Sequence, residues 1–252
     1  SSSKAKLNLP NNSNIIFAGL YWSAVYPKVN WSDKKNIVDN TAKTIKFKLP
    51  NQTYQDIVGE EIFYGSTENV TKDKVAYAYY KDLTTELQNL NSANGDYYAA
   101  NIKATIGSNI QVTSSAGWIL VVIFENNLEP NRRISIYDGF SEITGGANSL
   151  VAEFSYDGLQ TVTKGPVRAK LLTAAIGGQK GNEGDTFQLK DPNGDYQDIS
   201  TPNLNPFNDF FNSTISLDDS YLANRTPNSQ NSSGFDADLF TVNNVGNLLI
   251  NN

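Results

Sequence analysis

The sequence predicts an all-β protein, a jelly-roll-like β-sandwich with one short helix. Hydrophobic runs of strand length recur along its 252 residues, and residues that favour turns separate them. Only one stretch has the spacing of a helix. Charged residues make up 18% of the chain, below the share of about a quarter in an average globular protein. Asn, Ser, Thr, Tyr and Gly are plentiful instead, which is typical of strands and turns.

Most predicted strands of the first half stand out by their apolar content. Residues 15–24 (IIFAGLYWSA) are apolar and aromatic, which predicts a central strand. Residues 44–49 alternate apolar and polar side chains, which predicts a strand with one wet face. Residues 1–14 are polar and predict an extended lead-in, and 25–39 predict a loop. Further strands are predicted at 61–64, 75–80 and 97–106.

One short helix is predicted between two of these strands. Asp82 is of the type that caps helix N-termini. Leu83, Leu87 and Leu90 follow at helical spacing and form one apolar stripe. The helix is expected to end before Asn94, which begins an Asn-Gly turn signal.

Residues 116–140 hold the two clearest strand patterns. Residues 117–124 (GWILVVIF) are too few to span a bilayer, and their β-branched and aromatic content predicts a strand buried on both faces. Ile134 and Ile136 alternate with polar neighbours, which predicts a second strand with one side toward water.

The second half alternates predicted strands with turn-rich loops. Residues 177–185 form a glycine-rich loop, and 224–234 are polar. Strands are predicted at 149–154, 167–176, 186–189, 196–199 and 237–242. We predict one large domain over 1–252, an excerpt of a longer protein. The stretch 145–165 is the one place where an internal boundary would lie.

Composition excludes several kinds of chemistry. The chain has no Cys and no His, so it has no thiol catalysis, no imidazole acid–base device and no ordinary zinc site. The net charge is −6, and Lys and Arg are scattered. We therefore expect no nucleic-acid partner. No membrane-spanning segment is visible, so we expect no membrane insertion.

The run Asp191-Pro-Asn-Gly-Asp195 admits two interpretations. Its carboxylates and Asn193 have spacing that resembles the start of a calcium loop. However, Gly194 comes two places early, and Pro202 stands where a bidentate Glu is required. Asn-Gly between two alternating runs is what a hairpin turn needs, and this interpretation is favoured.

A second acidic cluster is a better metal candidate. Asp236 and Asp238 project to the same side of an extended chain, close enough to share one cation such as Ca²⁺. Like charges without a cation or donors repel, which argues for a ligand. Glu183 and Asp185 could add oxygens to the same site. Alternatively, Asp236 and Asp238 lie on a solvent-exposed sheet face or cap nearby backbone groups. Glu183 and Asp185 would then belong to a solvated loop.

Five motifs carry a resemblance to a known class of proteins. They are AGLYWSA at 18–24, the strand at 95–102 with its preceding helix, AGWILVVIFEN with RRISIYDGF, the Glu183-Gly-Asp185 turn and GFDADLF at 234–240. In this order the chain, from residue 15 onward, resembles a domain of long Bacteroidota surface proteins. These include gliding-motility adhesins and other substrates of the type IX secretion system. The resemblance implies export to the extracellular bacterial cell surface, an adhesive or structural role, and further strands supplied by other sequence.

Three functions remain open at this stage. The leading one is a non-enzymatic extracellular adhesion or structural module, whose partners are neighbouring domains or chains joined by strand addition. The second is a carbohydrate-binding module or glycan-active enzyme of jelly-roll fold, because two carboxylates can hydrolyse glycosides without His. Exposed aromatics such as Trp31 could contact surface glycans. The third is a subunit of a surface filament.

Overall fold

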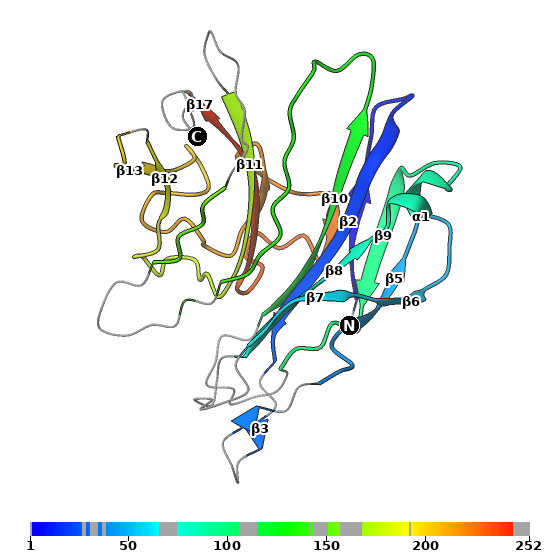
Figure 1. The fold of residues 1–252 in the computed structure, drawn as a ribbon, viewed down its shortest axis with the longest axis horizontal. Helices are drawn as coiled ribbons and strands as arrows, with labels where there is room; N and C mark the ends of the chain where they lie inside the picture. The colour runs from blue at the N-terminus through cyan, green and yellow to red at the C-terminus, as the bar shows by residue number, and fades with distance from the viewer. Residues whose placement is uncertain are drawn as a thin grey trace. The chain divides into compact units, whose positions relative to one another are not determined.

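The computed structural model describes residues 2–26, 29–30, 35–36, 39–65, 75–105, 115–141, 143, 151–156, 168–191 and 193–243. These residues contain 17 strands and one α-helix (Figure 1). The all-β fold with one short helix is confirmed. The chain groups into two compact units. Unit 1 comprises Ser1–Arg132, Asp138–Ala152 and Asn224–Pro227, and unit 2 comprises Arg133–Tyr137, Glu153–Ala223 and Asn228–Asn252.

Unit 1 contains two antiparallel sheets that share one core. The first sheet has the order β16 (Arg225–Thr226), β1 (Ser2–Leu7), β9 (Gly95–Ala100), β5 (Thr44–Lys48) and β6 (Gln55–Val58). The second has the order β10 (Ala116–Glu125), β2 (Asn14–Val25), β8 (Ala76–Asp82) and β7 (Glu60–Tyr64). β3 (Val29–Asn30) pairs antiparallel with β4 (Lys35–Asn36). The predicted sandwich is therefore present in this unit.

The core between these sheets follows from the period-2 pattern of their strands. On β2, Leu20, Trp22 and Ala24 are buried, and they pack with residues of the other sheet such as Phe47 and Tyr97. Burying large aromatic rings removes apolar area from water and is the main stabilising term. Trp22 satisfies its one polar group by donating from Nε1 to the carbonyl of Ala42 at 3.1 Å.

The predicted helix is α1 (Thr84–Gln88), which lies beside β2 (Figure 1). Its N-cap residue is Leu83, one position later than predicted. Asp82 nevertheless makes the kind of hydrogen bond expected of a cap, because its Oδ1 accepts from the Thr84 backbone N at 2.8 Å. Leu83 and Leu87 are buried in the core of unit 1, and Leu90 packs against it.

The strand predicted at 117–124 is β10, but it lies at a sheet edge. Among the described strands it pairs only with β2, from Ala116 opposite Ala24 to Glu125 opposite Asn14. Its interior side chains are half-buried. The prediction that both faces are buried was wrong, because an apolar run does not reveal whether the strand has one neighbour or two.

Three other sequence predictions were wrong about strands. Residues 1–14 are not merely a lead-in, since β1 pairs with β9 and β16. Residues 134–140 form no strand. Side-chain contacts hold two of these residues instead. The Tyr21 hydroxyl donates to Asp138 Oδ1 at 2.7 Å, and the Phe63 ring stacks on Phe140 with centroids 4.6 Å apart. The described part of 149–154 is also not a strand.

Unit 2 is built on one mixed sheet and a hairpin. The sheet has the order β11 (Arg168–Ile176), β17 (Phe235–Asn243), β14 (Ile215–Leu217) and β15 (Ser220–Tyr221). β17 runs antiparallel to β11 and parallel to β14. The predicted hairpin is present as β12 (Phe187–Lys190) and β13 (Tyr196–Ile199).

A second, smaller core stabilises unit 2. Ile199, Phe210, Phe240 and Val242 are its buried residues. Phe210 and Phe240 meet edge to face, with ring centroids 5.4 Å apart, a geometry that aromatic rings prefer. The prediction of one domain over 1–252 stays a prediction, and most of the boundary stretch 145–165 lies outside the described residues.

Candidate functional site

The predicted metal ligands Asp236 and Asp238 lie on the core-facing side of β17. Alternate residues of a strand point to the same face, so both share that face with Phe240 and Val242 of the apolar core. Both aspartates are fully buried, each 0% exposed. The alternative that they lie on a wet sheet face is therefore wrong.

The chain before and within β14 donates hydrogen bonds to both carboxylates. Asp238 Oδ2 accepts from Asn205 Nδ2 at 2.8 Å. Asp238 Oδ1 accepts from the Ser216 hydroxyl and, at 3.4 Å, from the Thr214 hydroxyl. Asp236 Oδ2 accepts from the Thr214 backbone N at 3.0 Å. The two aspartates thus hold an irregular segment against the sheet.

Burial dominates the electrostatics of this pair. Loss of water, followed by hydrogen bonding and repulsion from Asp238, raises the pKa of Asp236 to about 9. A carboxyl group removed from water favours its neutral form, and a neighbouring carboxylate adds to that preference. At neutral pH the Asp236 carboxyl is therefore neutral, unless a bound cation takes the place of its proton.

The other two predicted ligands lie in the glycine-rich loop. Asp185 forms an isolated bridge with Asp209, and its Oδ1 accepts from the Phe211 backbone N at 2.8 Å. Burial, and after it repulsion by Asp209, raises the pKa of Asp185. Glu183 is exposed. Within the described residues no three acidic side chains gather into a group that could hold a metal ion, and a shared site with the pair on β17 stays a prediction.

The Asp191–Asp195 run is a hairpin turn, as the favoured interpretation held. Asp191 Oδ1 accepts hydrogen bonds from the backbone N of Asn193 and of Asp195, both at 2.9 Å. Gly194 has φ +92°, the left-handed region that glycine adopts most easily. The carboxylate of Asp191 is thus occupied with closing the turn between β12 and β13.

Sequence reasoning missed the neutral residues around the buried pair. Asn205, Thr214 and Ser216 come from a segment without hydrophobic periodicity, so nothing in the sequence indicated where they face. Thr173 faces the pair from the other side, because it lies directly opposite Asp238 on β11 and opposite residues share a face. Its place in the alternating run of β11 was a usable signal.

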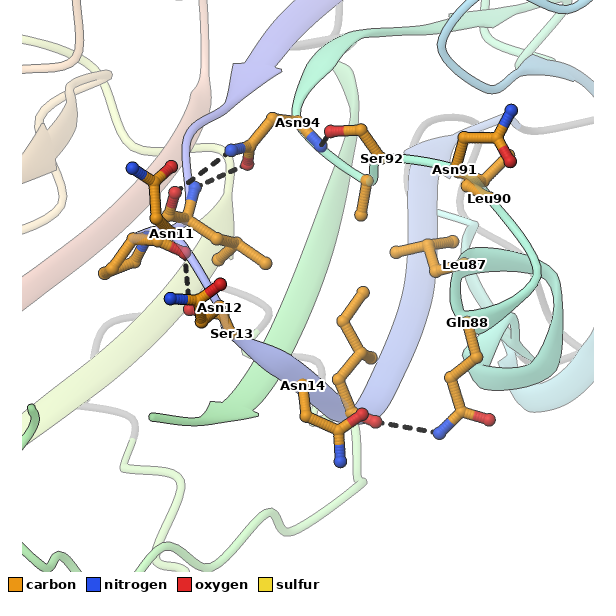
Figure 2. A pocket seen from close by; sticks show the side chains of 14 residues that line it. Asn11, Asn12, Ser13, Asn14, Leu87, Gln88, Leu90, Asn91, Ser92 and Asn94 are labelled. Carbon is orange, nitrogen blue, oxygen red and sulfur yellow. Dashed lines mark hydrogen bonds between the residues drawn. The ribbon is translucent and has the colours of Figure 1, made fainter. Parts of the chain in front are cut away.

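Unit 1 contains a polar pocket of about 280 Å³ near the start of β2 (Figure 2). Asn94 borders it and is bonded to the backbone of Leu9, and Gln88 Nε2 donates to the carbonyl of Ile15 at 2.7 Å. The lining residues are Leu9, Pro10, Asn11, Asn12, Ser13, Asn14, Ile15, Leu87, Gln88, Leu90, Asn91, Ser92, Ala93 and Asn94. This lining offers amides and hydroxyls, and it contains no aromatic ring and no carboxylate.

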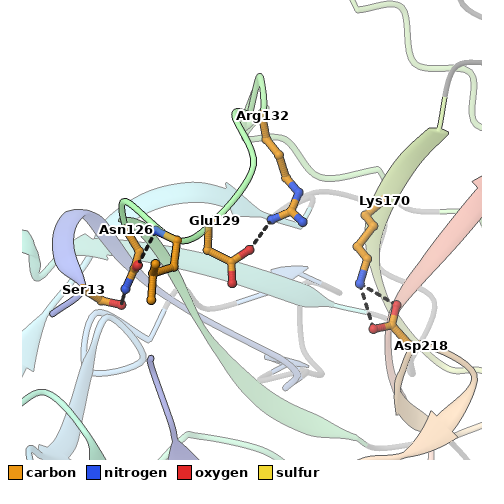
Figure 3. A network of polar contacts seen from close by, with 7 residues as sticks. Ser13, Asn126, Glu129, Arg132, Lys170 and Asp218 are labelled. Atoms are coloured by element: carbon orange, nitrogen blue, oxygen red, sulfur yellow. Dashed lines mark hydrogen bonds and ion pairs between the residues drawn. The ribbon is translucent and has the colours of Figure 1, made fainter. Parts of the chain in front are cut away.

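Exposed ion pairs occur in both units (Figure 3). In unit 2, Lys170 Nζ contacts both carboxylate oxygens of Asp218 at 2.7 Å. In unit 1, Arg132 contacts Glu129 at 3.1 Å. Pairs this exposed contribute at most about 1 kcal/mol each, and they suggest no chemistry.

In comparisons with known families, curated proteins and solved structures, no significant match to this chain was found. None of the helices in the described part of the chain is long and apolar enough to cross a membrane. The arguments for function therefore depend on the sequence motifs and the geometry of the chain itself.

Proposed function

We propose that this chain is a non-enzymatic β module of a bacterial cell-surface protein, with an adhesive or structural role outside the cell. Two lines support the proposal: the ordered motifs that resemble type IX secretion substrates, and an all-β structure in which sheets carry nearly all the regular backbone. Export, gliding motility and surface location follow from the resemblance alone.

The observation that carries the proposal is the open edge of β10. Among the described strands this ten-residue strand has one partner, β2. Residues 117–124 contain no charge and no proline. Its one register irregularity lies at Ile123 and Phe124, near the strand end. Proteins usually protect such edges with charges, prolines or bulges, because unpaired backbone groups invite another strand.

An open, apolar edge suits strand addition. A neighbouring domain or chain of the same assembly would add a strand beside β10, with backbone hydrogen bonds providing affinity. Side chains on both faces of β10 are half-buried, so an added strand would bury more apolar area. Repeated pairing of this kind would link modules into a surface structure.

The test places a charge on this edge. Val121 lies opposite Gly19 of β2 and is half-buried. We expect the unaltered chain to self-associate, or to bind a peptide of β-forming sequence, and Val121→Lys to abolish this while the chain stays folded. Val121→Thr, which keeps the β-branched shape, is the matched control. Sedimentation and circular dichroism measure both properties. A wild-type chain that is monomeric and binds no added strand would contradict the proposed mode of assembly.

Surface location needs a separate measurement. An antibody against this chain should label intact cells of the source organism, and removal of the coding segment should weaken attachment of those cells. Labelling that appears only after lysis would contradict the surface role. Imaging of the same cells would show filaments if the chain is a filament subunit.

Carbohydrate binding is the second candidate, and the pocket of Figure 2 favours it. Amide side chains such as Asn91 are good partners for sugar hydroxyls. A glycan array with wild type and Asn91→Ala tests this, with Gln52→Ala, outside the pocket lining, as control. Binding lost only in Asn91→Ala would favour the pocket. Hydrolysis of a polysaccharide panel would favour a glycan-active enzyme instead.

A further inference from the structure

The acidic pair, Asp236 and Asp238, is incompletely satisfied within its buried site. Three of its four carboxylate oxygens accept hydrogen bonds, from Asn205, Thr214 and Ser216. The fourth, Asp236 Oδ1, has no partner among the described residues although it is buried. A buried carboxylate oxygen without a partner is costly, so the site calls for either a proton or a bound cation.

A second unsatisfied oxygen faces the pair from β11. Thr173 Oγ1 is buried and likewise finds no hydrogen-bond partner in the described part of the chain. Thr173 lies directly opposite Asp238 in the ladder between β11 and β17, so both side chains project to the same face. Thr173 thus places a second unsatisfied oxygen on the same face of the sheet as the pair, across the ladder from Asp238.

The protein supplies no positive side chain to this place among its described residues. The contacts of the pair are an amide, two hydroxyls and a backbone N–H, all neutral. Lys170 is on the same strand as Thr173 but three positions away, hence on the opposite face. There its ammonium group is paired with Asp218 (Figure 3).

We propose that the acidic pair binds one Ca²⁺ ion, with ligand oxygens from Asp236, Asp238 and Thr173. Hard cations prefer oxygen ligands, and Ca²⁺ accepts flexible, irregular coordination, whereas Mg²⁺ demands near-ideal octahedral geometry. This site is independent of the surface role proposed above and of the β10 edge, because all its residues lie in unit 2.

Bound Ca²⁺ would stabilise the segment between β13 and β14. That segment is irregular, and part of it is deeply buried: Asn205, Asn212 and Ser213 are at most 3% exposed. Asn205, Thr214 and Ser216 fasten it to the acidic pair. A cation that holds both carboxylates in place would therefore hold the segment as well, and unit 2 would unfold less readily.

The test is calcium titration of the whole chain after chelator treatment, followed by calorimetry and by thermal unfolding at neutral pH. We expect one Ca²⁺ per chain and, at about tenfold excess over Kd, a rise of roughly 3–6 °C in the unfolding midpoint. Mg²⁺ should shift it less. Asp236→Asn should abolish the response, and Thr173→Val should weaken binding about tenfold, as for one charge-assisted contact.

Asp195→Asn is the control, because this exposed carboxyl lies in the hairpin turn whose spacing resembles a calcium loop. It should leave the calcium response unchanged. If Asp236→Asn does not fold, two measurements still test the proposal: the number of Ca²⁺ ions bound per wild-type chain and the Ca²⁺ affinity of Thr173→Val. A wild-type chain that binds no Ca²⁺ would overturn the proposal and leave Asp236 as a buried neutral carboxyl. A response that persists in Asp236→Asn would overturn it too, and a stronger Mg²⁺ response would overturn the choice of Ca²⁺.

Discussion

Gly59, the one residue between β6 and β7, lies against the indole of Trp22. A Cβ atom at this position would come within 2.3 Å of the Trp22 ring and 3.0 Å of Tyr79. Trp22 is 1% exposed and its Nε1 is hydrogen-bonded to Ala42. The ring therefore has little room to move, and the absence of a side chain at 59 is a packing requirement of the unit 1 core.

Gly59→Ala should therefore destabilise unit 1. Overpacking of a filled core costs about 1–3 kcal/mol, and the loss should appear as a lower midpoint in urea unfolding followed by Trp fluorescence. Gly139→Ala is the matched control, since a Cβ there meets nothing within 4 Å. Equal midpoints for the two variants would show that the Trp22 ring moves aside without cost.

The candidate site was partly predictable from the sequence at the scale of single residues. The spacing of Asp236 and Asp238 placed both on one face, and the structure confirms that arrangement. Their full burial was not predictable, because aspartates in strands are usually exposed. Asn205 was also out of reach, since its contact with Asp238 joins residues 33 apart through an irregular segment.

Elements were predictable where periodicity was long enough to detect. β2, β5 and β10 have runs of 12, 5 and 10 residues with clear apolar patterns. β14, β15 and β16 have only two or three residues each, too few for any period to show. Residues 134–140 show that a clear pattern is not sufficient. Their alternation is typical of a strand, but without a backbone partner they do not form one.

The hairpin of β12 and β13 gives a prediction at the scale of one element. Asp191→Ala removes an acceptor of two backbone hydrogen bonds in its turn, and we expect a loss of about 1–2 kcal/mol. Hydrogen exchange of the β12 and β13 amides measures it. Asp195→Ala serves as control, because the bond at that residue uses its backbone N and not its carboxyl group. Unchanged exchange in Asp191→Ala would mean that Gly194 alone sets the turn.

At the scale of the whole molecule, buried tyrosines replace many of the aliphatic residues of an ordinary core. The chain has 13 Tyr, and Tyr77, Tyr79 and Tyr97 are at most 3% exposed. Tyr77 donates its hydroxyl to the Lys103 carbonyl at 2.6 Å, and Tyr97 donates to Ala93 at 2.7 Å. These bonds need the protonated phenol, so the core of unit 1 is stable only while its tyrosines stay neutral.

Alkaline pH should therefore unfold unit 1. Burial, ahead of repulsion by Glu61, raises the pKa of Tyr79 to about 12 from the ordinary 10.0, and burial also raises the pKa of Tyr77 and of Tyr97. Above pH 10 the unfolded chain releases protons that the folded chain retains, so the free energy of unfolding falls as pH rises from about 10 to 12.

Tyrosinate absorbance and circular dichroism followed together should show a delayed ionisation step that coincides with unfolding. Tyr97→Phe should make the decline less steep, whereas Tyr54→Phe, at a ring that is 40% exposed, should not. Complete ionisation of the tyrosines while the ellipticity stays constant would show that these phenols reach water in the folded state.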